Sequence, residues 1–142
     1  VYWVITYVKK AKLILSLAFL CLLSGHFWLY PEKISQGWDA TTMHWNFFEV
    51  SKKMDKYIEK ENYVKEEIGT FFPHYKPKYY YYLEEKGGSD YLKATENETK
   101  YIYYSNAFNV ADSIIDELNN NWETIKEFEQ NRVYTKLLEK KD

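Results

Sequence analysis

The chain has 142 residues, of which 20% are aromatic, whereas glycine and proline are scarce at five and three residues. This composition excludes a disordered or low-complexity protein and leaves room for one compact domain plus an appendage. The net charge of −2 is unevenly distributed: the first thirty residues carry three lysines and no acid, so the rest has 16 basic (19 minus 3) and 21 acidic residues, a net charge of −5. An acidic globular part argues against a nucleic-acid partner, because phosphate binding needs a basic patch.

Residues 13–30, LILSLAFLCLLSGHFWLY, contain no Asp, Glu, Lys or Arg, and His26 is their one ionisable residue. As a helix this run would rise about 27 Å, close to the roughly 30 Å of a bilayer's hydrocarbon core. Trp28 and Tyr30, near the end of the run, are typical of residues at a membrane interface. We therefore predict a transmembrane helix at 13–30, with the lipid bilayer as a partner.

The preceding segment, residues 1–12, combines the uncharged VYWVITYV with Lys9, Lys10 and Lys12. VYWVITYV is typical of the end of an earlier span, and the lysines then form a basic cytoplasmic loop. Because positive charge marks the cytoplasmic side, we expect an integral protein of the cell or inner membrane, with residues after 30 on the extracytoplasmic side. The alternative is a signal peptide cut near Gly25, but no A-x-A-like site is present and the apolar HFWLY continues past it.

A linker at 31–37 leads into residues 38–142, which predict an extracytoplasmic α/β domain. Its first helix has an apolar face whose members recur at spacings of four and three residues. The members of this face are Met43, Phe47, Val50, Met54 and Tyr57. The helix is expected to end near residues 61–62.

Runs rich in aromatic and β-branched residues predict three strands after this helix. They lie at 64–72, 78–83 and 100–105, and GGSD at 87–90 is a break between the second and the third. In the third strand, aromatic residues occupy both sets of alternating positions, which predicts that both faces of the strand are buried. A turn at 106–109 follows it.

The C-terminal part predicts a helix and a hairpin. Ala111 to Leu118 forms a short apolar pattern with Asp112 near its N-terminus, and asparagines 119–121 are expected to end it. Alternating residues at 122–129 and 132–139, separated by two residues, predict a terminal hairpin. The fold class is therefore α/β: a small sandwich with one mixed sheet, two helices and a C-terminal β-hairpin, preceded by a transmembrane helix.

The sequence contains no self-sufficient catalytic motif. Cys21 is the only cysteine, so it can form neither an internal disulfide nor a cysteine metal site. His26, His44 and His74 lack the close spacing of metal ligands, and neither a phosphate-binding glycine loop nor the G-x-S-x-G of hydrolases is present. We therefore predict no catalytic residue, no metal and no cofactor in this chain.

The stretch SQGWDATTMHW concentrates three residues that could bind a ligand, Trp38, Asp39 and His44. At the outer face of a membrane they could meet the headgroup of a lipid-linked substrate. A structural interpretation competes with this one and is favoured. In it Asp39, Thr41 or Thr42 caps the following helix by accepting a hydrogen bond from a free N–H group, and Trp38 is anchored in the interface.

Several segments carry a family resemblance, above all YPEKISQGWDAT (30–41) and IGTFFP (68–73), followed by YIYYSNAFN, DELNNNW and VYTKLL. They resemble the C-terminal end of bacterial multi-pass glycosyltransferases of the dolichyl-phosphate-mannose protein mannosyltransferase and lipid A aminoarabinose transferase type. The resemblance covers residues 13–142. It implies a last transmembrane helix that leads into a small extracytoplasmic α/β domain, and a polyprenyl-phosphate sugar as the donor.

The resemblance implies a function without supplying an active site. In that superfamily the catalytic aspartate lies in the first outer loop, which this chain lacks, so Asp39 is not that residue. The chain is then expected to be a non-catalytic, membrane-anchored accessory domain, with the rest of a multi-pass protein or a lipid-linked sugar as its partner. The alternative is a complete single-span protein whose outer domain binds a partner and has no enzymatic activity.

Overall fold

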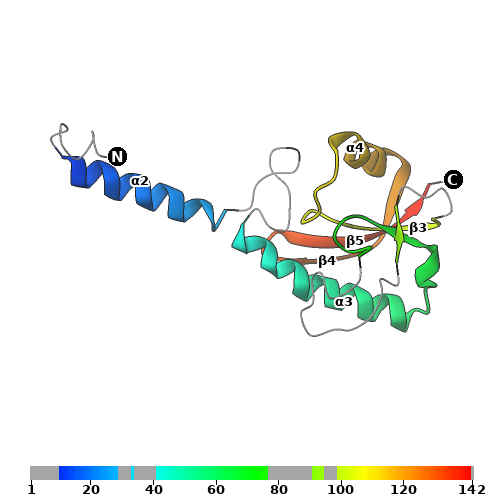
Figure 1. The fold of residues 1–142 in the computed structure, drawn as a ribbon. Helices are drawn as coiled ribbons and strands as arrows, with labels where there is room; N and C mark the ends of the chain where they lie inside the picture. Colours follow the sequence, from blue (N-terminus) through cyan, green and yellow to red (C-terminus); the bar gives the residue numbers. More distant parts are fainter. Residues whose placement is uncertain (1–9, 29–32, 34–40, 77–90, 95–98, 142) are drawn as a thin grey trace.

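A computed structural model describes residues 10–28, 33, 41–76, 91–94 and 99–141. Within these ranges a helix, α2, extends away from an α/β body (Figure 1). The body contains two further helices and a five-stranded mixed sheet. The predicted strand at 78–83 and the predicted break at 87–90 lie outside the described residues.

Helix α2 (Ala11–Gly25) has 15 residues, and none of them is buried. It begins two residues before the predicted span, so Lys12 lies in the helix and not in a loop. After Gly25 the helix ends in a turn with hydrogen bonds between residues three apart, in which the Phe27 N–H donates to the carbonyl of Ser24 at 3.0 Å. The predicted end of the span, residues 29 and 30, lies outside the described ranges. Within those ranges no helix combines the length and the apolar character needed to cross a membrane.

Helix α3 (Asn46–Lys60) confirms the predicted apolar face, with two differences. It buries Phe47, Val50 and Met54 as expected, but Ile58 takes the last buried place and Tyr57 is only half-buried. A short 3₁₀ helix, η1 (Thr42–Trp45), precedes it. The side chain of Met43 lies outside the described part of the structure.

The sheet has the strand order β2-β1-β3-β5-β4. Strands β1 (Ile68–Thr70), β2 (Leu92–Lys93) and β3 (Tyr101–Ser105) pair in parallel, and β3 pairs antiparallel with β5 (Val133–Lys140). The predicted mixed sheet and third strand are confirmed. The first predicted strand is too long, because a 3₁₀ turn, η2 (Lys65–Glu67), replaces its beginning.

Helix α4 (Asp112–Asn121) is longer than the sequence predicts, because the asparagines do not end it. The helix continues through Asn119, Asn120 and Asn121, and β4 (Trp122–Gln130) follows directly. Lys141 explains this: its ammonium group donates to the Asn120 carbonyl at 2.8 Å and its N–H to the Asn121 carbonyl at 2.9 Å. Carbonyl groups that a helix end leaves without partners are thus satisfied by a residue from the other end of the hairpin.

The terminal hairpin is confirmed to within a residue. Asn131 and Arg132 join β4 to β5, and both have positive φ angles, 51° and 68°. Positive φ at both central residues is the geometry of a type I′ turn, whose twist matches that of the paired strands. Asn131 also donates to the side-chain oxygen of Asn46 at 3.1 Å, so the turn contacts the start of α3.

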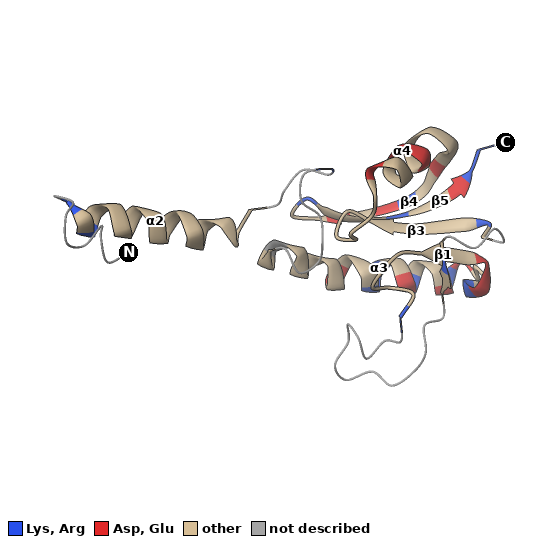
Figure 2. Ribbon diagram, turned by 45° about the horizontal axis from the view of Figure 1, so that its top comes forward, with Lys and Arg blue, Asp and Glu red and all other residues tan. Residues whose placement is uncertain are grey.

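The two helices of the body cover opposite faces of the sheet, α3 on one side and α4 on the other (Figure 2). Alternation along β3 explains how one strand serves both layers, since Tyr103 faces α3 whereas Ile102 and Tyr104 face α4. All three are buried, as expected for a strand covered on both faces. The core therefore lies on both faces of the sheet, with buried residues of α3 against one face and of α4 against the other.

Candidate functional site

The predicted binding residues do not assemble into an open site in the described part of the chain. His44 lies in η1 and is only 2% exposed, so it cannot meet an external ligand in this conformation. Trp28, predicted at the membrane interface, is 57% exposed beyond the end of α2. Trp38, Asp39 and Tyr30 lie outside the described residues.

The junction between α2 and α3 holds a contact that the sequence did not predict. Thr42 donates to the carbonyl of His26 twice, from its N–H at 3.1 Å and from its hydroxyl at 2.7 Å. The capping role predicted for Thr41 or Thr42 is therefore wrong: the residue at the start of α3 is Trp45, with no side-chain cap. The hydroxyl of Thr42 is used to hold the end of α2 against η1.

A buried polar cluster lies between α3 and the sheet, centred on His74. Its side chain is 1% exposed, and its ring centroid lies 4.4 Å from that of Tyr103 and 5.0 Å from that of Tyr91. His74 Nε2 lies 3.9 Å from Asp55 Oδ1, and the Tyr91 hydroxyl donates to the same oxygen at 2.6 Å. Polar groups taken out of water need such partners. Because His74 is enclosed, we assign the cluster to the architecture and not to catalysis.

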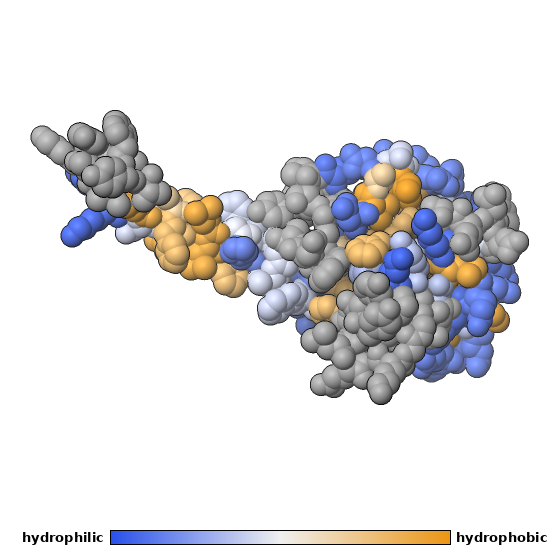
Figure 3. Space-filling model, in the orientation of Figure 1, coloured by the Kyte–Doolittle hydropathy of each residue, from blue (hydrophilic) through white to orange (hydrophobic). Residues whose placement is uncertain are grey.

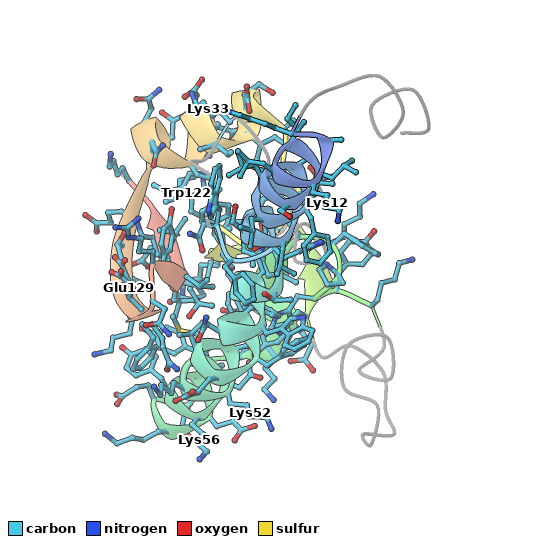
Figure 4. All side chains as sticks on the ribbon, turned by 90° about the vertical axis from the view of Figure 1, so that its left-hand side faces the viewer. Lys12, Lys33, Lys52, Lys56, Trp122 and Glu129 are labelled. Carbon is cyan, nitrogen blue, oxygen red and sulfur yellow. The ribbon has the colours of Figure 1, made fainter. Side chains whose placement is uncertain are left out.

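An open concave feature lies beside α4 in the described part of the body. A hollow of about 310 Å³ is bounded by Phe71 and Ile102 on the sheet side and by Ile114 and Glu117 on the helix side. A smaller hollow of about 120 Å³ adjoins it and shares Leu118 and Trp122 with the first. Figure 4 shows Trp122 near α4, at the start of its strand. Sequence reasoning placed Trp122 only in the hairpin.

The chemistry of these hollows suits contact and not reaction. Their walls are mainly aromatic and aliphatic, and the polar groups among them include Glu117 and Lys136. The amine of Lys136 lies 4.5 Å from the ring centroid of Tyr134 and 3.8 Å from Glu127, so it is held against the strand surface. Pockets with apolar walls and a few polar groups are the usual form of binding sites. Among the described residues, no three His, Cys, Asp or Glu side chains gather as a metal site.

The shifted pKa values of the described residues do not mark an acid–base site. Burial is the main cause that raises the pKa of Tyr63 above its usual value, and a hydrogen bond with Tyr101 is the main cause that raises that of Lys100. Both shifts reinforce the charge state that each group already has at neutral pH. Catalytic acids and bases are instead tuned toward the working pH.

Glu49 supplies a pH-dependent link between α3 and the hairpin. A hydrogen bond from Gln130 at 2.7 Å, and then the hydrogen bond and charge of Lys53, lower the pKa of Glu49 below its ordinary value of 4.5. A lowered pKa in the folded state means that the carboxylate stabilises the protein above the unfolded value and loses this effect as the pH falls through the folded value.

We therefore expect Glu49→Gln to be slightly less stable than the wild type at neutral pH, with the difference shrinking as the pH falls below 4.5 and through the lowered pKa of Glu49. Urea unfolding over a series of pH values measures this. Gln130→Ala, which removes the hydrogen-bond donor, should weaken the same pH dependence. A difference between Glu49→Gln and the wild type that stays constant with pH would contradict the assignment.

No family model matches the chain, and no curated protein or solved structure matches it either. The proposal for function therefore rests on the chain's own residues and on the resemblance of residues 30–41. Two surface features stand out among the described residues, the apolar surface of α2 and the hollows beside α4. Figure 3 shows apolar surface along α2 and a smaller apolar area near α4.

Proposed function

We propose that the chain is the membrane-anchored, extracytoplasmic C-terminal part of a polyprenyl-phosphate-sugar-dependent membrane glycosyltransferase, and that it lacks the catalytic loop itself. In this role the α/β body stands on the outer face of the membrane beside the catalytic part of the protein. It steadies that face or helps to present an acceptor.

The observation that carries the proposal is the surface of α2. The helix has no buried residue, and its apolar side chains point outward on every side. Those that expose a large apolar area are Leu13, Ile14, Leu17, Phe19, Leu20, Leu22 and Leu23. A helix that is apolar all round is stable only where something apolar surrounds it, such as lipid or other spans. At 15 residues it rises about 22 Å, so neighbouring spans or local thinning of the bilayer would accommodate its length.

The body supports an accessory role through its architecture. Its two helices pack on opposite faces of the sheet, and the side chains of His44 and His74 are buried. The resemblance of residues 30–41 to the junction of membrane glycosyltransferases adds the donor class, a polyprenyl-phosphate sugar. The packed body and the family resemblance support a domain that positions the acceptor or the catalytic part of the protein and does not itself carry out the transfer.

Fusions to the C-terminus test the predicted side of the membrane. Alkaline phosphatase, active only outside the cytoplasm, should be active when fused after Asp142, and green fluorescent protein exported unfolded at the same position should stay dark. Both fusions should sediment with membranes. A bright fluorescent fusion together with an inactive phosphatase fusion would place the body in the cytoplasm and reject the proposal.

A second candidate is a single-span protein whose outer domain binds a partner. The hollow of about 310 Å³ beside α4 favours this candidate, because it offers aromatic and aliphatic contacts at the surface of the body. The coding sequence upstream of Val1 separates the two. An in-frame continuation with several apolar spans supports the glycosyltransferase, and a stop codon directly upstream supports the single-span protein.

A further inference from the structure

We propose that the face of the body around Trp45 rests on the lipid surface beside α2, so that Phe27, Trp28 and Trp45 form one interfacial aromatic cluster. This inference rests on the membrane insertion of α2 proposed above. It adds which face of the body contacts the membrane. The partner is the headgroup region of the bilayer itself.

The contact between Thr42 and His26 fixes the direction of Trp45. In a 3₁₀ helix, residues three apart lie above one another on the same side. Thr42 and Trp45 are the first and last residues of η1, so their side chains share a side, and the Thr42 hydroxyl on that side donates to the carbonyl of His26 at 2.7 Å. Trp45 therefore lies on the side of η1 that contacts the end of α2.

The exposure of the three aromatic residues is unusual for a soluble surface. Phe27 is 62% exposed, Trp28 57% and Trp45 66%, although His44 beside Trp45 in the chain is buried. Phe27 and Trp28 follow His26 and Trp45 follows Thr42, so large exposed aromatic side chains lie on both sides of the Thr42–His26 contact. Exposed apolar surface of this kind marks a surface that has a partner. Tryptophan is enriched where a membrane meets water, because its ring is apolar and its indole N–H is polar. The position of the cluster next to the apolar α2 identifies that partner as lipid.

A second contact holds the body close to the point where the chain leaves α2. Lys33 forms an ion pair with Asp116 of α4, although the two residues are 83 positions apart in the sequence. Figure 4 shows Lys33 near α4 when the body is viewed from the side of α2. The pair places a positive charge on an acidic helix that would otherwise be repelled by anionic lipid. Two separate contacts thus join the body to the residues that follow α2.

Spin labels at single cysteines test the inference on the full chain in phosphatidylethanolamine–phosphatidylglycerol vesicles. In a Cys21→Ser background, labels are attached to Trp28→Cys, Trp45→Cys and Lys52→Cys. Lys52 is the matched control, because it is exposed on α3 seven residues beyond Trp45, about 10 Å along the helix axis. Collisions of each label with oxygen, which concentrates in lipid, are compared with collisions with a water-soluble nickel chelate.

We expect the label at 45 to resemble the label at 28, with more oxygen and fewer chelate collisions than the label at 52. A label at 45 that behaves like the one at 52, while 28 remains in lipid, overturns the inference and leaves the membrane anchor intact. Chelate access at 28 as well overturns the membrane anchor itself. As a check on the native side chain, lipids with a shallow nitroxide should quench the wild type more than Trp45→Phe, and equal quenching would also reject the contact.

Discussion

Replacing Leu17 and Leu20 of α2 by lysine should release the chain from the membrane fraction. Both side chains are more than half exposed along the middle of the helix, so they contact the surroundings and not the body. A lysine at the centre of a membrane helix costs about 3 kcal/mol, so two cost about 6 kcal/mol and shift the distribution by roughly four orders of magnitude. Extraction of membranes with alkaline carbonate, followed by sedimentation, measures the change.

A charge-matched control separates insertion from a general effect of added lysine. Ser113→Lys with Asn120→Lys adds the same two charges at exposed positions of α4, and this variant should remain in the pellet. The body of the Leu17→Lys and Leu20→Lys variant should unfold at the same temperature as the wild-type body, because neither leucine is part of its core. Retention of that variant in the pellet, or release of the wild type by carbonate, would refute the anchor.

The elements that the sequence predicts well are those with a strong local pattern. The apolar positions of α3 recur with the period of a helix, and this pattern located Phe47, Val50 and Met54 in the core. The hairpin of β4 and β5 follows from alternation, although its turn lies at Asn131 and Arg132, one residue later than predicted. Local periodicity carries this information because the buried face of each element is set by its own geometry.

The elements that the sequence misses depend on residues distant in the chain. The end of α4 is set by Lys141, which binds the carbonyls of the last turn, so the asparagines alone could not locate it. Strand β2 has two residues and owes its structure to parallel pairing with β1. Thr42 is diverted from capping by the carbonyl of His26. No local pattern contains these contacts.

The residues of the candidate site are also brought together by contacts that no local sequence pattern predicts. The cluster of His74, Asp55 and Tyr91 is assembled from α3 and two loops, and no spacing in the sequence links these residues. The sequence predicts Trp122 only as the first residue of a strand. Its place in the wall of the hollow beside α4 depends on the packing of that helix on the sheet. Trp45 is similar: its exposure depends on how η1 meets α2.

Phe47→Ala should be among the most destabilising single changes in the body. Phe47 is 1% exposed, and its ring centroid lies 5.3 Å from that of Phe108 and 5.9 Å from that of His74. It therefore joins the start of α3 to the turn after β3 and to the buried histidine. Deleting a buried phenylalanine costs about 3–5 kcal/mol, because the apolar contact is lost and a cavity remains. Such a loss is a large share of the roughly 5–15 kcal/mol that stabilises a domain.

Thermal and urea unfolding of the detergent-solubilised chain measure this loss, and the midpoint should fall by more than about 10 °C. Trp45→Ala is the control. Trp45 lies two residues before Phe47 and has a still larger aromatic side chain, but this side chain is mostly exposed. The effect of this substitution on unfolding in detergent should stay within about 0.5 kcal/mol. Equal large losses would mean that Trp45 is packed into the body, which would contradict the membrane-facing surface. Equal small losses would contradict the place of Phe47 in the core. A large loss for Phe47→Ala alone would show that the same short stretch of chain places one aromatic side chain in the core and offers the next to the membrane.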